Sequence, residues 1–250
     1  MNSTAIRLVV FACVFGAALL GLFLRTVLPE KHLSADSKDA VRLGMGMIAI
    51  MAALVLGLPV ASAKSFYDAQ GNALTQMSAN VITLDRLLSY YGPETREVRD
   101  LLRGAVVRQL QLMWHQDHQN LSQMNPTAGA AEILNGIQAL SPKNEAQHTF
   151  QAQALSMAFT LGNERWLMFE EETNSISLPL LAMLVFWLVI VFAGFGLFSP
   201  TNTTVVATLF LCAVAVSGAV FLIVEMYTPF KGLIQLSDAP LRNALAYMGK

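Results

Sequence analysis

The feature that most constrains the fold is a stretch of 52 residues without a charged side chain, from Thr173 to Val224. A membrane-spanning helix needs about 20 apolar residues, so the stretch is too long for one span and long enough for two. Pro200 and Asn202 interrupt it with residues that favour a turn. The stretch therefore predicts a transmembrane hairpin, with spans at about 176–198 and 205–224.

Two further apolar segments lie near the N-terminus, each bounded by basic residues. No small-residue cleavage site follows the first segment, which favours a retained anchor over a secretory signal. Charged residues make up only 13% of the chain, about half the share of a soluble domain. The sequence therefore predicts an all-α integral membrane protein with four transmembrane helices. The N-terminal hairpin is predicted over residues 1–63, with spans at about 8–24 and 43–63.

The region between the second and third spans, residues 64–175, holds most of the charged residues and is predicted to be a helical extramembrane domain. Gly92 and Pro93 are expected to end one helix and begin the next. Ser141 and Pro142 are expected to begin a long helix. Residues 225–250 read as an amphipathic C-terminal tail. One apolar stripe in the domain follows helical spacing: Leu74, Met77, Val81, Leu84 and Leu88.

The membrane orientation follows from the number of spans and the flanking charges. Four spans place both termini and the central domain on the same side. Basic residues near the membrane number five on that side and four on the other, which favours a cytoplasmic central domain. We expect a multi-pass protein of the bacterial inner membrane.

The sequence carries no catalytic motif that we can identify. Phosphate-binding loops, zinc-protease motifs and nucleophile elbows are absent from it. The net charge of −1 gives no basis for binding nucleic acid. We therefore expect no enzymatic activity, no catalytic residue and no organic cofactor.

Two groups of residues raise the question of a metal site. Glu170, Glu171 and Glu172 precede the third span, where a helix C-terminus disfavours negative charge. Either the helix ends before them, or they begin the next helix, or a divalent cation such as calcium binds there. His115 and His118, with Asp117 nearby, have metal-ligand spacing, but a solvated helix face is the favoured interpretation.

A basic stripe, Arg96, Arg99 and Arg103, follows helical spacing in the central region. It could attract anions to a vestibule. Interleaved acidic residues offer ordinary helix ion pairs instead, and this second interpretation is favoured.

The spans carry two further patterns. Met47, Met51, Leu54 and Leu58 share a face of the second span, which could line an apolar constriction or face lipid. Glu225 ends the fourth span as an ionisable residue near membrane depth, which makes it a functional candidate. Small residues suited to close helix packing fall on one face of the first and fourth spans: Gly16, Thr208, Cys212, Ala215 and Ala219.

Four blocks of sequence resemble the bacterial bestrophin-like domain family, and together they extend over nearly the whole chain. They are "LVLGLPVASAKSFYD", "ITLDRLLSYYGPETREVRDLLR", "GFGLFSPTNTTV" and "FLIVEMYTPFKGLIQLSDAPLRNAL". The resemblance implies kinship to bestrophins, which are pentameric anion channels with four spans and cytosolic helices. Because the block around Pro200 and Asn202 matches the family, this turn is expected to pack against a specific neighbour.

The chain departs from bestrophins at their calcium-binding motif. Bestrophins carry Asn-Pro-Phe-Gly followed by an acidic cluster, whereas only Pro229 and Phe230 match here and the cluster is reduced to Asp238. Calcium gating through this motif is therefore not expected.

Two functional hypotheses follow. The first is a homo-oligomeric anion channel of bestrophin-like design, with lipid and small inorganic ions as its partners and the second span lining the pore. The second is a non-conducting membrane scaffold, whose central helices bind a partner.

Overall fold

The structure is a computed structural model that describes residues 3–27, 35–114, 128–173 and 178–248. Within these ranges the chain forms helices and no strand, which confirms the all-α prediction. Four of the described helices are long and apolar enough to cross a membrane. The chain divides into two compact units: unit 1 comprises Met1–Phe66 and Ile176–Tyr227, and unit 2 comprises Tyr67–Ser175 and Thr228–Lys250.

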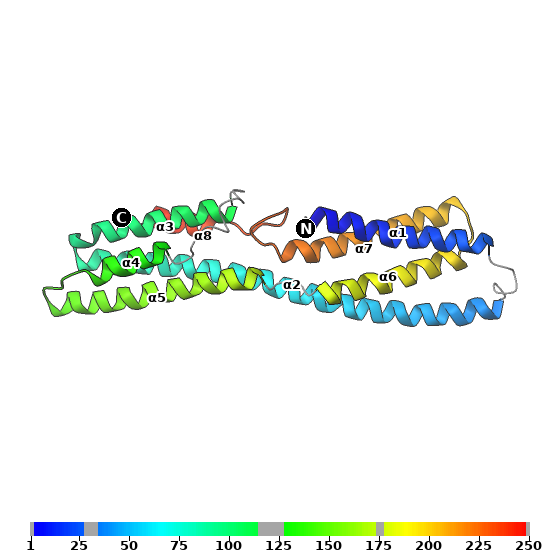
Figure 1. Ribbon diagram of the computed structural model, residues 1–250, viewed down its shortest axis with the longest axis horizontal. Helices are drawn as coiled ribbons and strands as arrows, with labels where there is room; N and C mark the ends of the chain where they lie inside the picture. Colours follow the sequence, from blue (N-terminus) through cyan, green and yellow to red (C-terminus); the bar gives the residue numbers. More distant parts are fainter. Residues whose placement is uncertain (1–2, 28–34, 115–127, 174–177, 249–250) are drawn as a thin grey trace. The chain divides into compact units, whose positions relative to one another are not determined.

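The helices follow one another along the chain (Figure 1). Their bounds are α1 Ser3–Val27, α2 Ala35–Tyr91, the 3₁₀ helix η2 Pro93–Thr95, α3 Arg96–Trp114, α4 Ala128–Gln138, α5 Glu145–Thr173, α6 Leu178–Phe198, α7 Thr203–Met226 and α8 Ala239–Tyr247. The predicted second span and the predicted apolar stripe that begins at Leu74 belong to one helix of 57 residues, α2. Pro59 lies inside this helix.

In unit 1, α1 packs along both α6 and α7 (Figure 1). The contact between α1 and α6 is close because glycines face backbone. A Cβ atom at Gly21 would overlap the carbonyl oxygen of Ala193, and one at Gly196 would overlap that of Ala18. The core of the unit consists of Val10, Val14, Ala18, Leu22, Leu184, Leu188, Phe192, Leu209, Ala213 and Val220.

In unit 2, the second part of α2 packs with α3, α4, α5 and α8 around one apolar core. All five residues of the predicted stripe are buried, so this prediction is confirmed: Leu74, Met77, Val81, Leu84 and Leu88. On α3 the buried positions are Val98, Leu102 and Val106. The C-terminal helix α8 contributes Leu241 and Ala244 to the same core.

The junctions between helices confirm one expectation and correct another. Gly92 has φ 136°, a left-handed conformation that suits glycine, and α2 ends directly before it. The α5 helix, by contrast, begins at Glu145 and not at the predicted Pro142. The Asn144 side chain accepts a hydrogen bond from the Gln147 N–H at 2.8 Å, which is the geometry of an N-cap. The N-cap of α5 is therefore Asn144, three residues after the predicted cap Ser141.

Candidate functional site

The predicted pore-lining side chains lie on the outer face of α2. Met47, Met51, Leu54 and Leu58 are 68%, 51%, 71% and 63% exposed in the single chain. Their spacing places them on one side of the helix. Large apolar side chains at this exposure need a covering of lipid, another copy or a narrow pore, and the prediction that they line a pore stays a prediction.

The opposite face of α2 attaches this helix to the rest of unit 1. Met45, Ala52 and Ala63 are buried there. A Cβ atom at Gly194 of α6 would overlap the Met45 sulfur, so the two helices touch at this point. Near the other end of the span, the Tyr227 hydroxyl lies 3.0 Å from the Ser62 hydroxyl. In the described part of the chain, the inner face of α2 thus contacts the rest of unit 1, whereas Met47, Met51, Leu54 and Leu58 are mostly exposed.

In the basic stripe of α3, Arg99 forms an ion pair, whereas Arg96 and Arg103 form none with the residues that the structure describes. The Arg99 guanidinium donates to both carboxylate oxygens of Asp85, at 2.8 and 2.9 Å. Asp85 is buried on α2, so this bidentate ion pair joins α2 to α3. Arg96 and Arg103 are exposed and line the same open cavity of about 340 Å³.

Ion pairing shifts the pKa of two groups in this area. The hydrogen bonding of Arg99 to the Asp85 carboxylate, which accepts, raises the pKa of Arg99, so the guanidinium stays charged. A backbone hydrogen bond and the Lys143 ammonium, which lies 3.1 Å away, lower the pKa of the exposed Glu94 carboxyl. Arg99 is thus ion-paired, although with Asp85 of α2 and not with an acidic residue interleaved in the stripe. The anion-attracting interpretation stays a prediction for Arg96 and Arg103.

The small residues predicted to pack helices together face outward in the single chain. Gly16, Thr208, Cys212 and Ala215 are exposed, and Ala219 is half-buried. A Cβ atom at Gly16 would meet nothing within 4 Å. Any close packing at these positions would therefore have to involve another copy or a partner.

The turn between α6 and α7 begins at Ser199 and holds the residues predicted for it. Asn202 is the N-cap of α7: its side chain accepts a hydrogen bond from the Val205 N–H at 2.9 Å. Pro200 is exposed beside it. The guanidinium of Arg25, at the end of α1, donates to the Ser199 carbonyl oxygen. The turn thus has a contact within its own chain.

Three residues of the fourth family block, Glu225, Pro229 and Phe230, are buried. Glu225, in the last turn of α7, is 3% exposed. Pro229 and Phe230 follow in unit 2, where the Phe230 ring packs edge to face on Trp114 with centroids 5.5 Å apart. Phe230 is therefore part of the core of unit 2.

The structure addresses the metal predictions only in part. Among the described side chains, no three His, Cys, Asp or Glu come together as a metal site. Glu170, Glu171 and Glu172 lie in the last turn of α5, so the alternatives that placed them beyond this helix are wrong. Their side chains, and the residues His115, Asp117 and His118, lie outside the described part of the chain.

The structure gives a place in a helix contact or a pocket to two kinds of residue that the sequence patterns did not single out. The glycines at close helix contacts, Gly194 and Gly196, were not singled out, although small residues in spans are a signal for such contacts. Arg165 was only one of the five basic residues counted near the membrane on the side of the central domain. Its spacing of seven and four residues from Ala158 and Leu161 could have placed it on the buried face of α5.

These helices, with their long apolar faces and glycine contacts, define an all-α membrane protein. The profile of the Bestrophin-like domain family matches residues 12–241. The chain therefore belongs to the bestrophin-like family, as its four sequence blocks predicted. A search of curated proteins found no match to the chain.

Proposed function

We propose that the chain forms a homo-oligomeric anion channel in the bacterial inner membrane, with the outer face of α2 lining the pore. The observation that carries the proposal is the exposed row Met47, Met51, Leu54 and Leu58 in a member of the bestrophin-like family. The family's kinship to pentameric channels supports an oligomer around a central axis.

The burial of the four spans supports this assignment of α2. Of its most apolar window, 17% is buried in the chain, compared with 28% to 33% for the other three spans. The apolar rows of several copies around a central axis would form a constriction, which conducts ions only when water fills it. The attached inner face at Met45 and Ser62 would keep the row directed away from α6 and α7.

The charges of unit 2 support anions as the permeating species. In the proposed arrangement unit 2 is an extramembrane vestibule on the cytoplasmic side, together with both termini. Arg96 and Arg103 are exposed cations without an ion pair among the described residues, so they would raise the local concentration of anions. Arg99 serves structure instead, through Asp85.

Calcium gating and catalysis form no part of the proposal. The segment that would correspond to the bestrophin calcium motif keeps only Pro229 and Phe230, and Phe230 packs in the core. The proposal also assigns no enzymatic reaction and no cofactor to the chain. A weak cation site at Glu170, Glu171 and Glu172 is a separate hypothesis.

The test is ion flux through the purified chain in liposomes, with chloride and sodium gradients and with and without calcium. We expect chloride flux well above sodium flux, unchanged by calcium. The variant with Arg96→Gln and Arg103→Gln should lower chloride flux severalfold at low salt and much less at high salt, because salt screens exposed charges. Arg86→Gln, at another exposed position of unit 2, is the matched control and should leave flux unchanged.

No flux under any of these conditions, together with a monomer or dimer in detergent, would overturn the channel proposal. A specific observation supports the scaffold alternative in that case. On α5, Phe159, Trp166 and Leu167 are 64%, 49% and 51% exposed at helical spacing. Such an apolar face in unit 2 is suited to binding another protein.

A further inference from the structure

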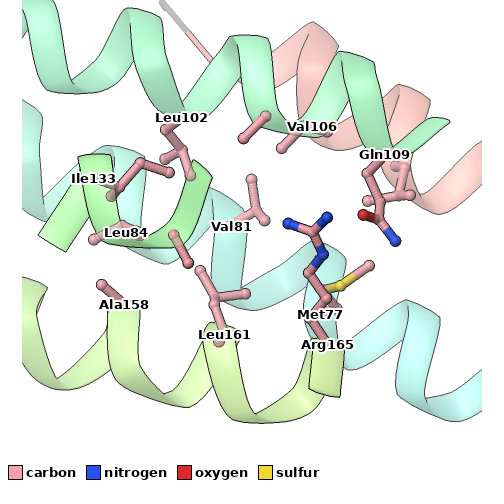
Figure 2. Close-up of a pocket in the computed structure, with 14 residues that line it drawn as sticks. Met77, Val81, Leu84, Leu102, Val106, Gln109, Ile133, Ala158, Leu161 and Arg165 are labelled. Carbon is pink, nitrogen blue, oxygen red and sulfur yellow. The ribbon is translucent and has the colours of Figure 1, made fainter. Parts of the chain in front are cut away.

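Unit 2 contains an apolar pocket that the proposed channel does not use. It lies between α2, α3, α4 and α5, with Leu241 of α8 also in its wall, and has a volume of about 80 Å³ (Figure 2). Most of its wall is aliphatic. The residues that form the apolar part include Val81, Leu84, Leu102, Val106, Ile133 and Leu161.

One end of this pocket is polar and positively charged. Figure 2 shows the Arg165 guanidinium directed into the pocket from α5, with the Gln109 carboxamide of α3 at the same end. Arg165 is half-buried. The Gln109 amide nitrogen lies 3.2 Å from the Met113 sulfur, a weak acceptor, so Gln109 can exchange this contact for a stronger one.

A second cation lies close to this polar end. The Arg108 guanidinium of α3 lies beside Gly129, at the beginning of α4. Burial and the charge of Arg108 together lower the pKa of Arg165. Helix N-termini also favour negative charge, so α4 adds to the positive potential at this end. An anion bound here would relieve the repulsion between the two arginines.

No carboxylate among the described residues forms an ion pair with Arg165. The neighbouring Glu164 accepts a hydrogen bond from the Asn80 side chain at 2.7 Å and thus engages α2 instead. A guanidinium stays charged in proteins, and a partly buried charge without a partner is costly. The pocket therefore offers the site for an anionic group that the described part of the chain does not supply.

We propose that this pocket binds a small amphipathic monocarboxylate, with Arg165 holding the carboxylate and the aliphatic wall holding the tail. The guanidinium fork matches a carboxylate in two parallel hydrogen bonds. Gln109 can donate a further bond to the same group. At about 10–15 Å³ for each water-sized group, the pocket has room for roughly five to eight non-hydrogen atoms. A carboxylate with three to six carbons fits this size.

The positively charged end and the aliphatic wall of the pocket together favour a small monocarboxylate over other classes of ligand. Chloride or phosphate would leave the aliphatic wall uncovered, and a neutral alcohol would leave Arg165 without an anion. A cationic ligand would be repelled by Arg165 and Arg108. A fatty acid released from a membrane has the same carboxylate, but its longer tail would have to leave the pocket through its opening.

The test is isothermal titration of the full chain in nanodiscs with butanoate, hexanoate and decanoate, against empty nanodiscs as the blank. We expect one saturable site, with butanoate or hexanoate bound more tightly than decanoate. Hexan-1-ol and inorganic phosphate should each bind at least tenfold more weakly than hexanoate. Tighter binding of decanoate would keep the carboxylate site but assign it to membrane-derived fatty acids.

The matched variants separate a binding role from a structural one. Arg165→Gln should weaken hexanoate binding about tenfold or more, because it removes a charge-assisted pair. Arg165→Lys should weaken it less, and Arg86→Gln should leave it unchanged. Without ligand, the Tm of Arg165→Gln should equal or exceed that of the parent chain, because Arg165 has no ion pair to lose. Absence of saturable hexanoate binding, or equal binding by Arg165→Gln, would overturn the proposal whatever the flux assay shows.

Discussion

Unit 1 and unit 2 both consist of packed helices, but the contacts between helices within unit 1 differ in kind from those within unit 2. In unit 1, α1 and α6 approach so closely that Gly21 and Gly196 face carbonyl oxygens of the opposite helix. In unit 2, large side chains such as Leu84 and Ile137 fill the space between helices, and the Asp85–Arg99 ion pair joins two of them.

The difference follows from the surroundings that each sequence is suited to. Lipid chains are as apolar as leucine, so association of spans depends on close packing of small residues. In water, burying an apolar stripe is favourable in itself, and amphipathic helices need no close backbone contact. We therefore expect that a methyl group added at a helix contact destabilises unit 1. We expect unit 2 to be destabilised when a core side chain is shortened.

The largest expected effect is the removal of a core side chain from unit 2. Leu84 is 0% exposed, so Leu84→Ala leaves a cavity and should lower the free energy of unfolding by about 3 kcal/mol. Leu167→Ala, at a half-exposed position of α5, is the control and should cost much less. Thermal unfolding followed by circular dichroism measures both. Equal effects would show that Leu84 is not in a packed core.

The next effect is the addition of one methyl group to unit 1. Gly196→Ala would force α1 and α6 apart at Ala18 and should cost about 2 kcal/mol, even though alanine gains up to about 1 kcal/mol of helix propensity. Gly16→Ala adds the same methyl where a Cβ meets nothing within 4 Å, so it should be neutral or stabilising. Unfolding in detergent micelles compares the two. The account of unit 1 fails if Gly196→Ala is as stable as Gly16→Ala.

A smaller effect is expected at the turn between α6 and α7. Asn202→Ala removes the hydrogen bond to the Val205 N–H and should cost about 1 kcal/mol. Asn202→Ser keeps a capping oxygen and should retain most of the stability. The Tm of each variant in micelles gives the comparison. A Tm for Asn202→Ala equal to the parent's would mean that the cap is dispensable.

The smallest effect concerns the pH dependence of unit 2. The folded state lowers the pKa of Glu94 below its ordinary value of 4.5. The stabilisation that the ionised Glu94 carboxylate contributes is therefore present above pH 4.5, and it is lost as the pH falls through the lower folded-state pKa. Glu94→Gln should remove this part of the acid sensitivity, and Lys143→Gln should reduce it. Urea unfolding at a series of pH values below 4.5 measures the slope, and an unchanged slope would contradict the assignment.

Sequence patterns predicted the features that depend on side-chain periodicity or on a single backbone requirement. The stripe from Leu74 to Leu88 repeats at helical spacing, and its burial was predicted correctly. The end of α2 was predicted from Gly92, whose left-handed conformation few other residues adopt. The four spans followed from length and charge alone.

Features that depend on two distant segments could not be predicted in this way. Gly196 faces Ala18 only because α1 and α6 cross there, and neither segment alone specifies the crossing. The carboxylate that pairs with Arg99 is Asp85 on the preceding helix, and not one of the acidic residues interleaved on α3. Arg165 lies in an apolar pocket because four other helices, α2, α3, α4 and α8, line it.

The central proposal is that the outer face of α2 lines a pore, which fills with water when it opens. It can be tested most directly by cysteine modification, after Cys13 and Cys212 have been replaced by alanine. Leu54→Cys in proteoliposomes should react with a charged, membrane-impermeant thiosulfonate, because the reaction requires a thiolate in water. The modification should then block chloride flux. The control is Phe186→Cys on α6, whose side chain is 60% exposed on an apolar helix and is expected to face lipid.

The account predicts rapid modification of Leu54→Cys and little or none of Phe186→Cys. Protection of both positions, or modification of Leu54→Cys without any effect on chloride flux, would contradict it.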